Sequence, residues 1–369
     1  MNTPSLPLVK RIVQERWIGK GLLLLLMVGT LFYIGAKAVQ SPQLFFQQLL
    51  NGLQLGFVYA LIALGYTMIY GIVKLINFAH GDVFMVGAFV SYYAVSRFRL
   101  HLWLGSIIPN APEALVLVIG TLTVMILSMI VCAVMAVTIE RIAYKPLRNA
   151  PRISALITAI GVSFFLEYFG ALPFVFTANY ITYQSPFKVI TWYINKGIHM
   201  MEPGTQVPPG SITFSSMFII ILVVSILLMA GLQFIVKRTK LGKAMRAVSY
   251  DKPTARLMGI KVDSIISYTF AIGASLAGAA GILYAIAYGQ VSFIMGILPG
   301  LKAFVAAVLG GIGSIPGALV GALILGQVET MSSGYISTPM RDAIVFSVLI
   351  LVLLVRPTGI FGEPEREKA

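Results

Sequence analysis

Long, unbroken apolar runs recur along the whole chain, separated by short polar or basic segments. A hydrocarbon core about 30 Å thick needs roughly 20 apolar residues in a helix that rises about 1.5 Å per residue. By that measure the sequence predicts spans at 21–38, 44–72, 76–96, 113–139, 153–176, 213–236, 263–288 and 342–355, with a glycine-rich apolar region at 300–334. Because barrel strands are about ten residues long and alternate in polarity, the predicted fold is all-α, a polytopic membrane protein with about 8–10 transmembrane helices.

The composition agrees with a chain embedded in a membrane. Of the 369 residues, 58% are hydrophobic and only 11% are charged, which leaves too little polar surface for a soluble globule. A net charge of +14 would fit a protein that binds nucleic acid, but the basic residues cluster in a few loops beside apolar runs, so no nucleic-acid partner is predicted. The single cysteine, Cys132, excludes a disulfide framework and a cysteine-based metal cluster, and we expect it to be a small packing residue.

The positions of lysine and arginine predict the orientation of the chain in the membrane. The N-terminal segment, the turn that holds Arg141, Lys145, Arg148 and Arg152, and the segment 237–261 are all basic, and they lie on one side if every predicted span crosses once. We expect that side to be the cytoplasm. The segment 177–212 has few basic residues and is expected to be an external loop.

Two parts of this topology leave alternatives. Arg97 and Arg99 fall on the external side, so either the 44–96 region contains a re-entrant piece or these residues are exceptions to a statistical rule, which is the interpretation we favour. The run at 21–38 follows a basic segment, but no small-residue cleavage site comes after it, which favours an uncleaved anchor span. Residues 1–43 are therefore predicted to be an N-terminal extension, 44–362 the main membrane domain, and 363–369 a short charged cytoplasmic tail.

The stretch 298–334 cannot form two comfortable full spans, because helix-breaking residues interrupt it. In lipid such breaks are tolerated only where the backbone is buried in protein or lines a cavity, so we expect broken or re-entrant helices here. Transporters place discontinuities of this kind near the translocation path, whereas the alternative is a tight packing seam of small residues. The candidate pathway residues in this stretch are Gly310, Gly311, Gly313 and Pro316.

The chain lacks the motifs of the enzymes that could reside in a membrane. It has no GxxxxGK[ST] loop for nucleotide phosphates and no HExxH zinc motif. The run GIGSIPG at 311–317 has neither a preceding strand nor the acidic residue of a dinucleotide site. We therefore predict no catalytic residue, no metal site and no cofactor bound by this chain.

Ionisable residues within membrane spans are costly and are therefore candidates for function. Asn77, His80 and Asp82 belong to the polar interruption INFAHGD, which predicts either a polar wall for a zwitterionic solute, a conformational latch, or a cluster satisfied by its own hydrogen bonds. The other candidates are Lys74, Glu167, Lys302 and Glu329. Of these, Lys302 and Glu329 are candidates for a charge pair across the broken region, although nothing in the sequence shows that they meet.

The basic segment 237–262 carries local signals for two short helices. Lys240 begins an amphipathic stretch, Asp251 is placed to cap a second helix with Pro253 in its first turn, and Gly259 is placed to end it. Two short helices across the cytoplasmic face would give a partner protein a rigid surface. A positively charged surface on anionic lipid is the alternative.

Several strings resemble the permease family of high-affinity branched-chain amino-acid ABC transporters. They are NGLQLGFVYALIALGYTMIYGIVKLINFAHGDVFMVGAF, ERIAYKPLR, GKAMRAVSYDKPTARLMGI, MGILPGLKAFVAAVLGGIGSIPGALVGALILG and LLVRPTGIFG, in the family's order and spacing. The resemblance covers roughly residues 45–362. Residues 1–43 precede it and add a span that many relatives lack.

This resemblance implies a multi-pass, non-catalytic subunit of the bacterial inner membrane. Its implied partners are a homologous second permease, two cytoplasmic ATPases that use ATP–Mg, and a periplasmic solute-binding protein. The resemblance also implies that the loop 237–262 docks into an ATPase groove, with Gly242, Arg246, Ala247, Asp251, Ala255, Leu257 and Gly259 as coupling residues. The expected solutes are branched-chain amino acids; urea, short amides or other amino acids remain alternatives, and an ion-coupled carrier that uses Asp82 and Glu167 is a weaker one.

Overall fold

Six long helices dominate the computed structural model, which describes residues 29, 32–148, 150–195, 197–201, 207–356 and 358–362. These helices are α2 (Pro42–Val73), α5 (Glu113–Ile139), α6 (Arg152–Gly170), α7 (Ser216–Arg238), α10 (Val262–Tyr288) and α12 (Ile315–Tyr335). Each is long and apolar enough to cross a membrane. The predicted all-α polytopic fold is confirmed.

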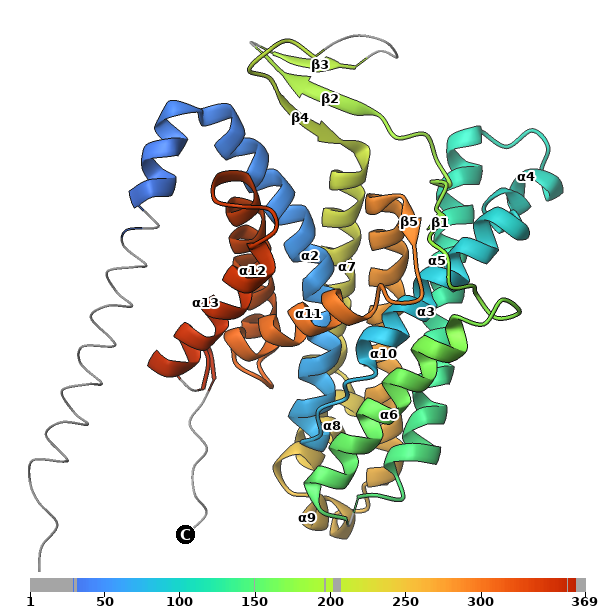
Figure 1. The fold of residues 1–369 in the computed structure, drawn as a ribbon. Coiled ribbons are helices and arrows are strands. Elements are labelled where there is room, and N and C mark those ends of the chain that lie inside the picture. The colour runs from blue at the N-terminus through green and yellow to red at the C-terminus, as the bar shows by residue number, and fades with distance from the viewer. Residues whose placement is uncertain are drawn as a thin grey trace, which may run out of the picture.

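Shorter helices pack among or beside these six. They are α3 (His80–Tyr92), which continues as a π-helical turn (Tyr93–Arg97), α11 (Ile297–Gly310) and α13 (Arg341–Val355). The core is centred on α2 and α10, which pack against each other and against α3, α5, α11 and α12 (Figure 1). Most of the predicted anchor at 21–38 and the whole tail 363–369 lie outside the described residues; residues 32–40 are helical.

The predicted break in 298–334 is confirmed. α11 has 14 residues, too few to cross the hydrocarbon core, whereas the 21 residues of α12 suffice. The turn between them needs glycine, because Gly311 and Gly313 have φ angles of 105° and 98°. Ser314 then caps α12 by accepting a hydrogen bond from the backbone N–H of Gly317 at 3.2 Å.

The C-terminal segment 358–362 completes the end of α11. The backbone N–H groups of Ile360 and Phe361 donate to the carbonyl oxygens of Leu309 and Gly310, both at 2.9 Å. A helix end leaves carbonyl groups without partners, and in lipid they would be costly. The stretch TGIFG therefore caps a half-helix inside the membrane domain.

The region predicted as a second span at 76–96 is also discontinuous. Residues 74–77 are not helical, and α3 begins at the fully buried His80 in the middle of the bundle. The helix then runs toward α4 (Trp103–Ile107) at the outer end (Figure 1). Arg97 and Arg99 lie in the chain between α3 and this short helix, and their external position stays a prediction.

The external segment 177–212, expected to be a loop, contains short strands. β2 (Thr191–Ile194) pairs with both β3 (Ile198–Met200) and β4 (Ile212–Ser215), all antiparallel. β1 (Ile181–Thr182) pairs with β5 (Gln290–Val291) and ties this segment to the end of α10. The strands lie at one end of the molecule and α8 and α9 at the other, which agrees with the predicted orientation (Figure 1).

Small residues let the central helices approach closely. Ser128 of α5 donates a hydrogen bond to the carbonyl oxygen of Gly87 in α3 at 2.8 Å, and Cys132 is fully buried at the same crossing. A Cβ atom on Gly326 of α12 would lie 2.7 Å from the Cα atom of Gly56 in α2. These faces pack within the subunit, where close contact replaces the hydrophobic driving force that lipid does not provide.

Candidate functional site

The half-helices α3 and α11 cross where both begin, in the core of the bundle. A Cβ atom on Gly300 would lie 2.7 Å from the Cα atom of Gly81, and one on Gly81 would lie 3.0 Å from the Cα atom of Gly300. Only glycine at both positions lets the two backbones meet at this distance. Two interrupted helices therefore start side by side at one point inside the membrane domain, an arrangement that transporters use around solute sites.

A cavity of about 240 Å³ lies beside this crossing, between α3, α6 and α11. Its polar side chains are Asp82, Ser163 and Glu167, and its walls include Tyr66 and Phe78. The Ser163 hydroxyl donates to the Asp82 carboxylate at 2.5 Å. The volume is below the range of about 300–1,000 Å³ typical of drug-sized ligands, so a small solute fits it best.

The three polar residues of INFAHGD point to different neighbours. Asp82 lines the cavity, whereas Asn77 accepts a hydrogen bond from the Tyr144 hydroxyl at 2.6 Å. The His80 ring packs edge-on against the ring of Tyr66, with centroids 4.7 Å apart. The structure thus does not bring all three into one polar wall. Of the other candidates, Glu167 joins Asp82 at the cavity, and Lys74 is exposed at the end of α2.

Lys302 and Glu329 form the predicted charge pair, and both are buried. The Lys302 ammonium lies 2.7 Å from a Glu329 carboxylate oxygen and 2.7 Å from one of Asp342. The Tyr59 hydroxyl donates to the other Glu329 oxygen at 3.1 Å. This network joins α2, α11, α12 and α13, and none of its members lines the cavity at the α3–α11 crossing.

The glycine-rich turn supports both interpretations of the 298–334 stretch in part, the lining of a pathway and a packing seam of small residues. Gly310 packs against Gly317 of α12, and Gly311 packs against Gly362. Gly313 instead borders a cavity of about 100 Å³, which Thr67 of α2 and Arg246 of α8 (Lys240–Tyr250) also line. Pro316 lies in the first turn of α12. Part of the turn is therefore a packing seam, and Gly313 alone of these four residues faces a cavity.

The basic loop folds as the sequence predicts, into α8 and α9 (Lys252–Leu257). Thr239 caps α8 through the backbone N–H of Gly242 at 3.1 Å, and Asp251 caps α9 through that of Thr254 at 3.3 Å. Gly259 ends α9 with a φ of +81°, a conformation that favours glycine.

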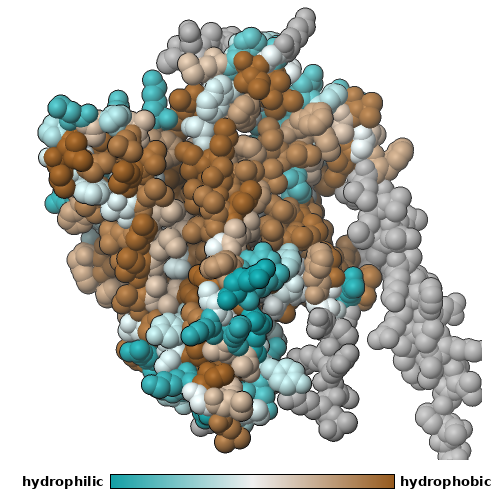
Figure 2. All heavy atoms as spheres, turned by 180° about the vertical axis from the view of Figure 1, so that it is seen from behind, coloured by the Kyte–Doolittle hydropathy of each residue, from teal (hydrophilic) through white to brown (hydrophobic). Residues whose placement is uncertain are grey.

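Some of the predicted coupling residues hold the α8–α9 loop in place, and others are exposed to solvent. Gly242 and Ala255 are buried, and the Arg246 guanidinium donates to the Val236 carbonyl oxygen. Leu257 is 87% exposed and the adjacent Met258 78% exposed at the tip of the loop. Figure 2 shows a brown apolar surface across the middle of the molecule and teal residues gathered toward this lower end, with brown residues among them. The tip is thus an apolar patch set in polar surroundings.

A network of charged residues lies behind this tip, and the sequence analysis did not predict it. Arg148 pairs with the buried Glu140 and with Asp263, whose carboxylate lies 2.5 Å from the guanidinium. The Arg256 guanidinium of α9 lies 3.8 Å from the same Asp263. The ERIAYKPLR string and the basic loop therefore meet in space, which their separation of about a hundred positions hides in the sequence.

Lys252 forms a second link from α9 to the bundle. Its ammonium donates to the Val73 carbonyl oxygen at the end of α2, at 3.1 Å. Partial burial, followed by the charges of Arg148, Arg256 and Lys74, lowers the pKa of Lys252 below its usual value. α9 is thus attached to α2 by Lys252, and by the charge network to α10 and to Glu140 in the π-helical turn (Glu140–Tyr144) that follows α5.

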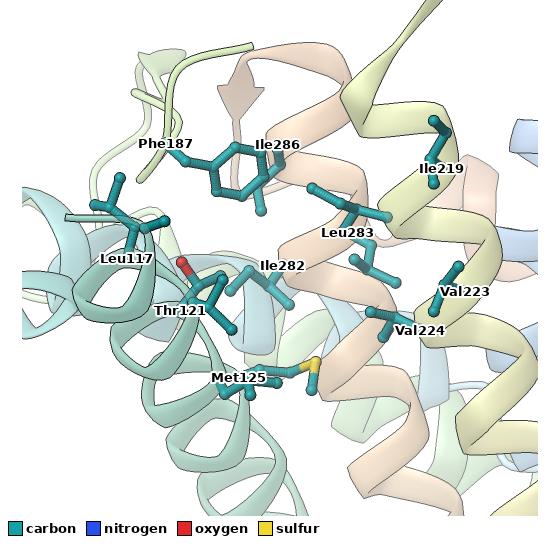
Figure 3. Close-up of a pocket in the computed structure, with 14 residues that line it drawn as sticks. Leu117, Thr121, Met125, Phe187, Ile219, Val223, Val224, Ile282, Leu283 and Ile286 are labelled. Atoms are coloured by element: carbon teal, nitrogen blue, oxygen red, sulfur yellow. The ribbon is translucent and has the colours of Figure 1, made fainter. Parts of the chain in front are cut away.

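A cavity of about 510 Å³ lies between α5, α7 and α10 under Phe187 (Figure 3). Figure 3 shows aliphatic side chains such as Leu117, Val223 and Ile286 around it, and the Thr121 hydroxyl is the sole polar side-chain group in its lining. Burying a charged solute there would be costly, since its walls offer no ionic partner. It suits a lipid acyl chain better than a zwitterion. Among the described residues no cluster of histidine, cysteine, aspartate and glutamate could hold a metal ion.

These features define a multi-pass membrane protein of the transporter class, with interrupted helices around a small internal cavity and helical elements displayed at one membrane face. The family model described as the branched-chain amino acid transport system permease component matches residues 48–354. This chain belongs to that family and is a branched-chain amino acid permease component of a transport system.

Individual relatives match over most of their length. The high-affinity branched-chain amino acid transport system permease protein LivH of Salmonella typhimurium is 40% identical over 88% of this chain and 97% of the relative. The permease protein BraD of Pseudomonas aeruginosa is 41% identical over 88% and 98%. A probable LivH of Methanocaldococcus jannaschii is 26% identical over 82% and 88%. No solved structure matches this chain.

Proposed function

We propose that this chain is the permease subunit of an ATP-binding-cassette importer that carries branched-chain amino acids across the bacterial inner membrane. Two cytoplasmic ATPases would hydrolyse ATP–Mg, a homologous second permease would complete the membrane domain, and a periplasmic protein would deliver the solute. The family and the names of the relatives support the solute class. The exposed tip of the α8–α9 pair is the observation that supports partner ATPases as the source of energy.

The tip has the physical properties of a docking surface. Leu257 and Met258 are large apolar side chains in water at the basic face, and burying them against a partner would recover hydrophobic free energy of about 1.5–3 kcal/mol each. The capping bonds of Thr239 and Asp251 hold both helices in place before a partner binds, so little ordering cost remains. The tip is a rigid apolar projection surrounded by basic residues. Such a surface is better suited to bind in a groove of a partner protein than to lie against lipid headgroups.

The attachments behind the tip support transmission of force. A displacement of α9 would act on α2 through Lys252, and on α5 and α10 through Asp263 and Arg148. α2 and α10 are the central helices of the bundle. A stroke from the cytoplasmic side would therefore reach the elements that surround the cavity at the α3–α11 crossing.

Leu257→Glu tests the docking surface. We expect the variant to be present in membranes at the wild-type level, because the position is exposed, while ATPase co-purified with the permease and ATP-driven leucine uptake by the reconstituted complex fall at least about tenfold, equivalent to about 1.4 kcal/mol. Ile198→Glu makes the same change at an exposed position in β3 at the opposite end, and should leave ATPase co-purification unchanged. Full co-purification and uptake by Leu257→Glu would refute the proposal.

A further inference from the structure

An apolar groove opens on the side of the bundle between α5 and α7. α5 packs mainly on α10 and α3, and α7 packs mainly on α2 and α8, so the two helices contact each other little. The cavity of about 510 Å³ under Phe187 lies between them, and buried side chains of α10 form its floor (Figure 3). The side chains at its rim on α5 and α7 are exposed: Val118, Leu122, Ile219 and Val223.

The groove lies in the outer half of the membrane domain. It is lined by the first turns of α5 and α7 and by the last turns of α10, at the end of the molecule that carries the strands. Ala114 and Met125, its extreme residues on α5, are about 16 Å apart at about 1.5 Å per residue, close to half of a hydrocarbon core of about 30 Å. The groove therefore has the length of one leaflet.

The lining of the groove requires an apolar occupant. Water would find few hydrogen-bond partners there, because the Thr121 hydroxyl is the sole polar side-chain group in the lining. An empty groove would leave its walls without van der Waals contacts on one side. Since the rim is open toward the membrane, the occupant comes from the lipid or from an apolar segment of another protein.

The size of the groove favours a lipid chain over a helix. A volume of about 510 Å³ spread along about 16 Å gives a mean cross-section of roughly 30 Å². A helix with its side chains is about 10–12 Å across, which corresponds to roughly 80–110 Å². A single extended acyl chain is much thinner than a helix and matches the groove in both length and width.

Charges of both signs flank the lining residues. Lys188 follows Phe187, which lies over the groove, and Glu113 precedes Ala114 at the start of α5. Lys188 and Glu113 are both exposed. A phosphate group beside Lys188 and an ammonium group near Glu113 would complement these charges, as in a zwitterionic phospholipid. Exposed ionic contacts contribute little, so they select the headgroup while burial of the acyl chain provides most of the binding.

We propose that this groove binds one phospholipid of the outer leaflet, with an acyl chain along α5, α7 and α10, the phosphate beside Lys188 and the ammonium group near Glu113. The site shares no lining residue with the cavity at the α3–α11 crossing, and it depends neither on the solute nor on the energy source. α7 leads through Thr239 into α8. The lipid therefore supports the outer half of the helix that carries the docking element.

A photoreactive residue at the rim identifies the occupant. The complete transport complex is made with p-benzoylphenylalanine in place of Val118, which is 57% exposed, and is reconstituted in vesicles of equal parts phosphatidylethanolamine and phosphatidylglycerol. The same replacement at Val134, which is 62% exposed on α5 but outside the groove, is the matched control. One portion of each sample is irradiated in the vesicles and another after extraction into dodecyl maltoside, and the adducts are identified by mass.

Persistence in detergent distinguishes a bound lipid from the surrounding ones. We expect a phosphatidylethanolamine adduct at position 118, at least half of which survives extraction, whereas the lipid adduct at position 134 falls at least fivefold. Equal loss at both positions would show ordinary lipid contact only and overturn the site. An adduct to another protein subunit at position 118 would overturn it in favour of a protein interface, and an equal yield of phosphatidylglycerol adduct would overturn the headgroup assignment.

A variant that fills the groove provides a second test. Val223→Trp places an indole ring at the rim of α7, and native mass spectrometry of the extracted complex should show one phospholipid fewer per permease than in wild type. Val134→Trp makes the same change outside the groove and should retain that phospholipid. Equal phospholipid content in Val223→Trp and wild type would overturn the proposal. Neither measurement uses leucine uptake, so the proposed function stands or fails separately.

Discussion

The buried pair of Lys302 and Glu329 gives a prediction whose size follows from its surroundings. Both side chains are almost inaccessible, at 3% and 5% exposure, so the pair belongs with buried ion pairs and not with surface pairs. Lys302→Met keeps an unbranched side chain that is one heavy atom shorter, and it removes the charge. Breaking a buried pair by removing one partner costs about 3–5 kcal/mol, because the remaining charge is left uncompensated.

The remaining contacts set the expected value within that range. Without Lys302, Glu329 keeps the Tyr59 hydroxyl at 3.1 Å and the half-exposed Arg341 at 3.6 Å. These partners cannot replace a contact of 2.7 Å, but they compensate part of the charge, so we expect a loss of about 3 kcal/mol, near the lower end. On a scale of about 2–4 °C per kcal/mol, the Tm of the purified protein in detergent should fall by about 6–12 °C.

A double-mutant cycle shows whether the pair itself is responsible. Lys302→Met/Glu329→Gln removes both charges, and we expect it to recover at least half of the lost stability. Lys188→Met removes a lysine from the external segment and should change the Tm by no more than about 1 °C. A wild-type Tm for Lys302→Met, or a double variant less stable than the sum of the single losses, would show that the reasoning about uncompensated charge is wrong.

Three further substitutions test other contacts. Gly81→Ala should destabilise the protein by about 1–3 kcal/mol in thermal unfolding, because the new Cβ atom meets the backbone of α11. Gly161→Ala places a Cβ atom in open space and should be tolerated. Equal Tm values for the two variants would contradict the close crossing. Arg148→Met should leave Glu140 buried without its cation and reduce both Tm and ATP-driven uptake, and unchanged uptake would exclude the network from coupling. Gly259→Ala should cost about 1 kcal/mol through backbone strain and slow uptake without loss of membrane insertion, and normal uptake would show that the end of α9 tolerates distortion.

Local chemistry in the sequence predicts the elements outside the hydrocarbon core well. Asp251 and Gly259 place the ends of α9, because capping depends on neighbouring residues alone. The break at Gly311–Ser314 follows for the same reason. The charge pair of Lys302 and Glu329 is predictable because few alternatives exist for ions in lipid.

The sequence is less informative where lipid makes every helix face apolar. The run from 76 to 96 contains the polar interruption INFAHGD, but the start of α3 at His80 coincides with a close contact between Gly81 and Gly300, which are far apart in the sequence. Without polar and apolar faces there is no periodicity to show which side of α2 meets α11, so the cavity with Ser163 could not be foreseen. The strands of the external segment depend on pairings between distant residues, which short apolar stretches do not specify.

The cap that residues 358–362 place on α11 has a consequence for biosynthesis. The carbonyl groups of Leu309 and Gly310 leave the ribosome about 50 residues before the N–H groups that satisfy them. At roughly 5–20 residues per second, this end of the half-helix stays open for about 3–10 seconds. During that interval the carbonyl groups at this end of α11 need water or another donor, because their partners at 360 and 361 have not yet been synthesised.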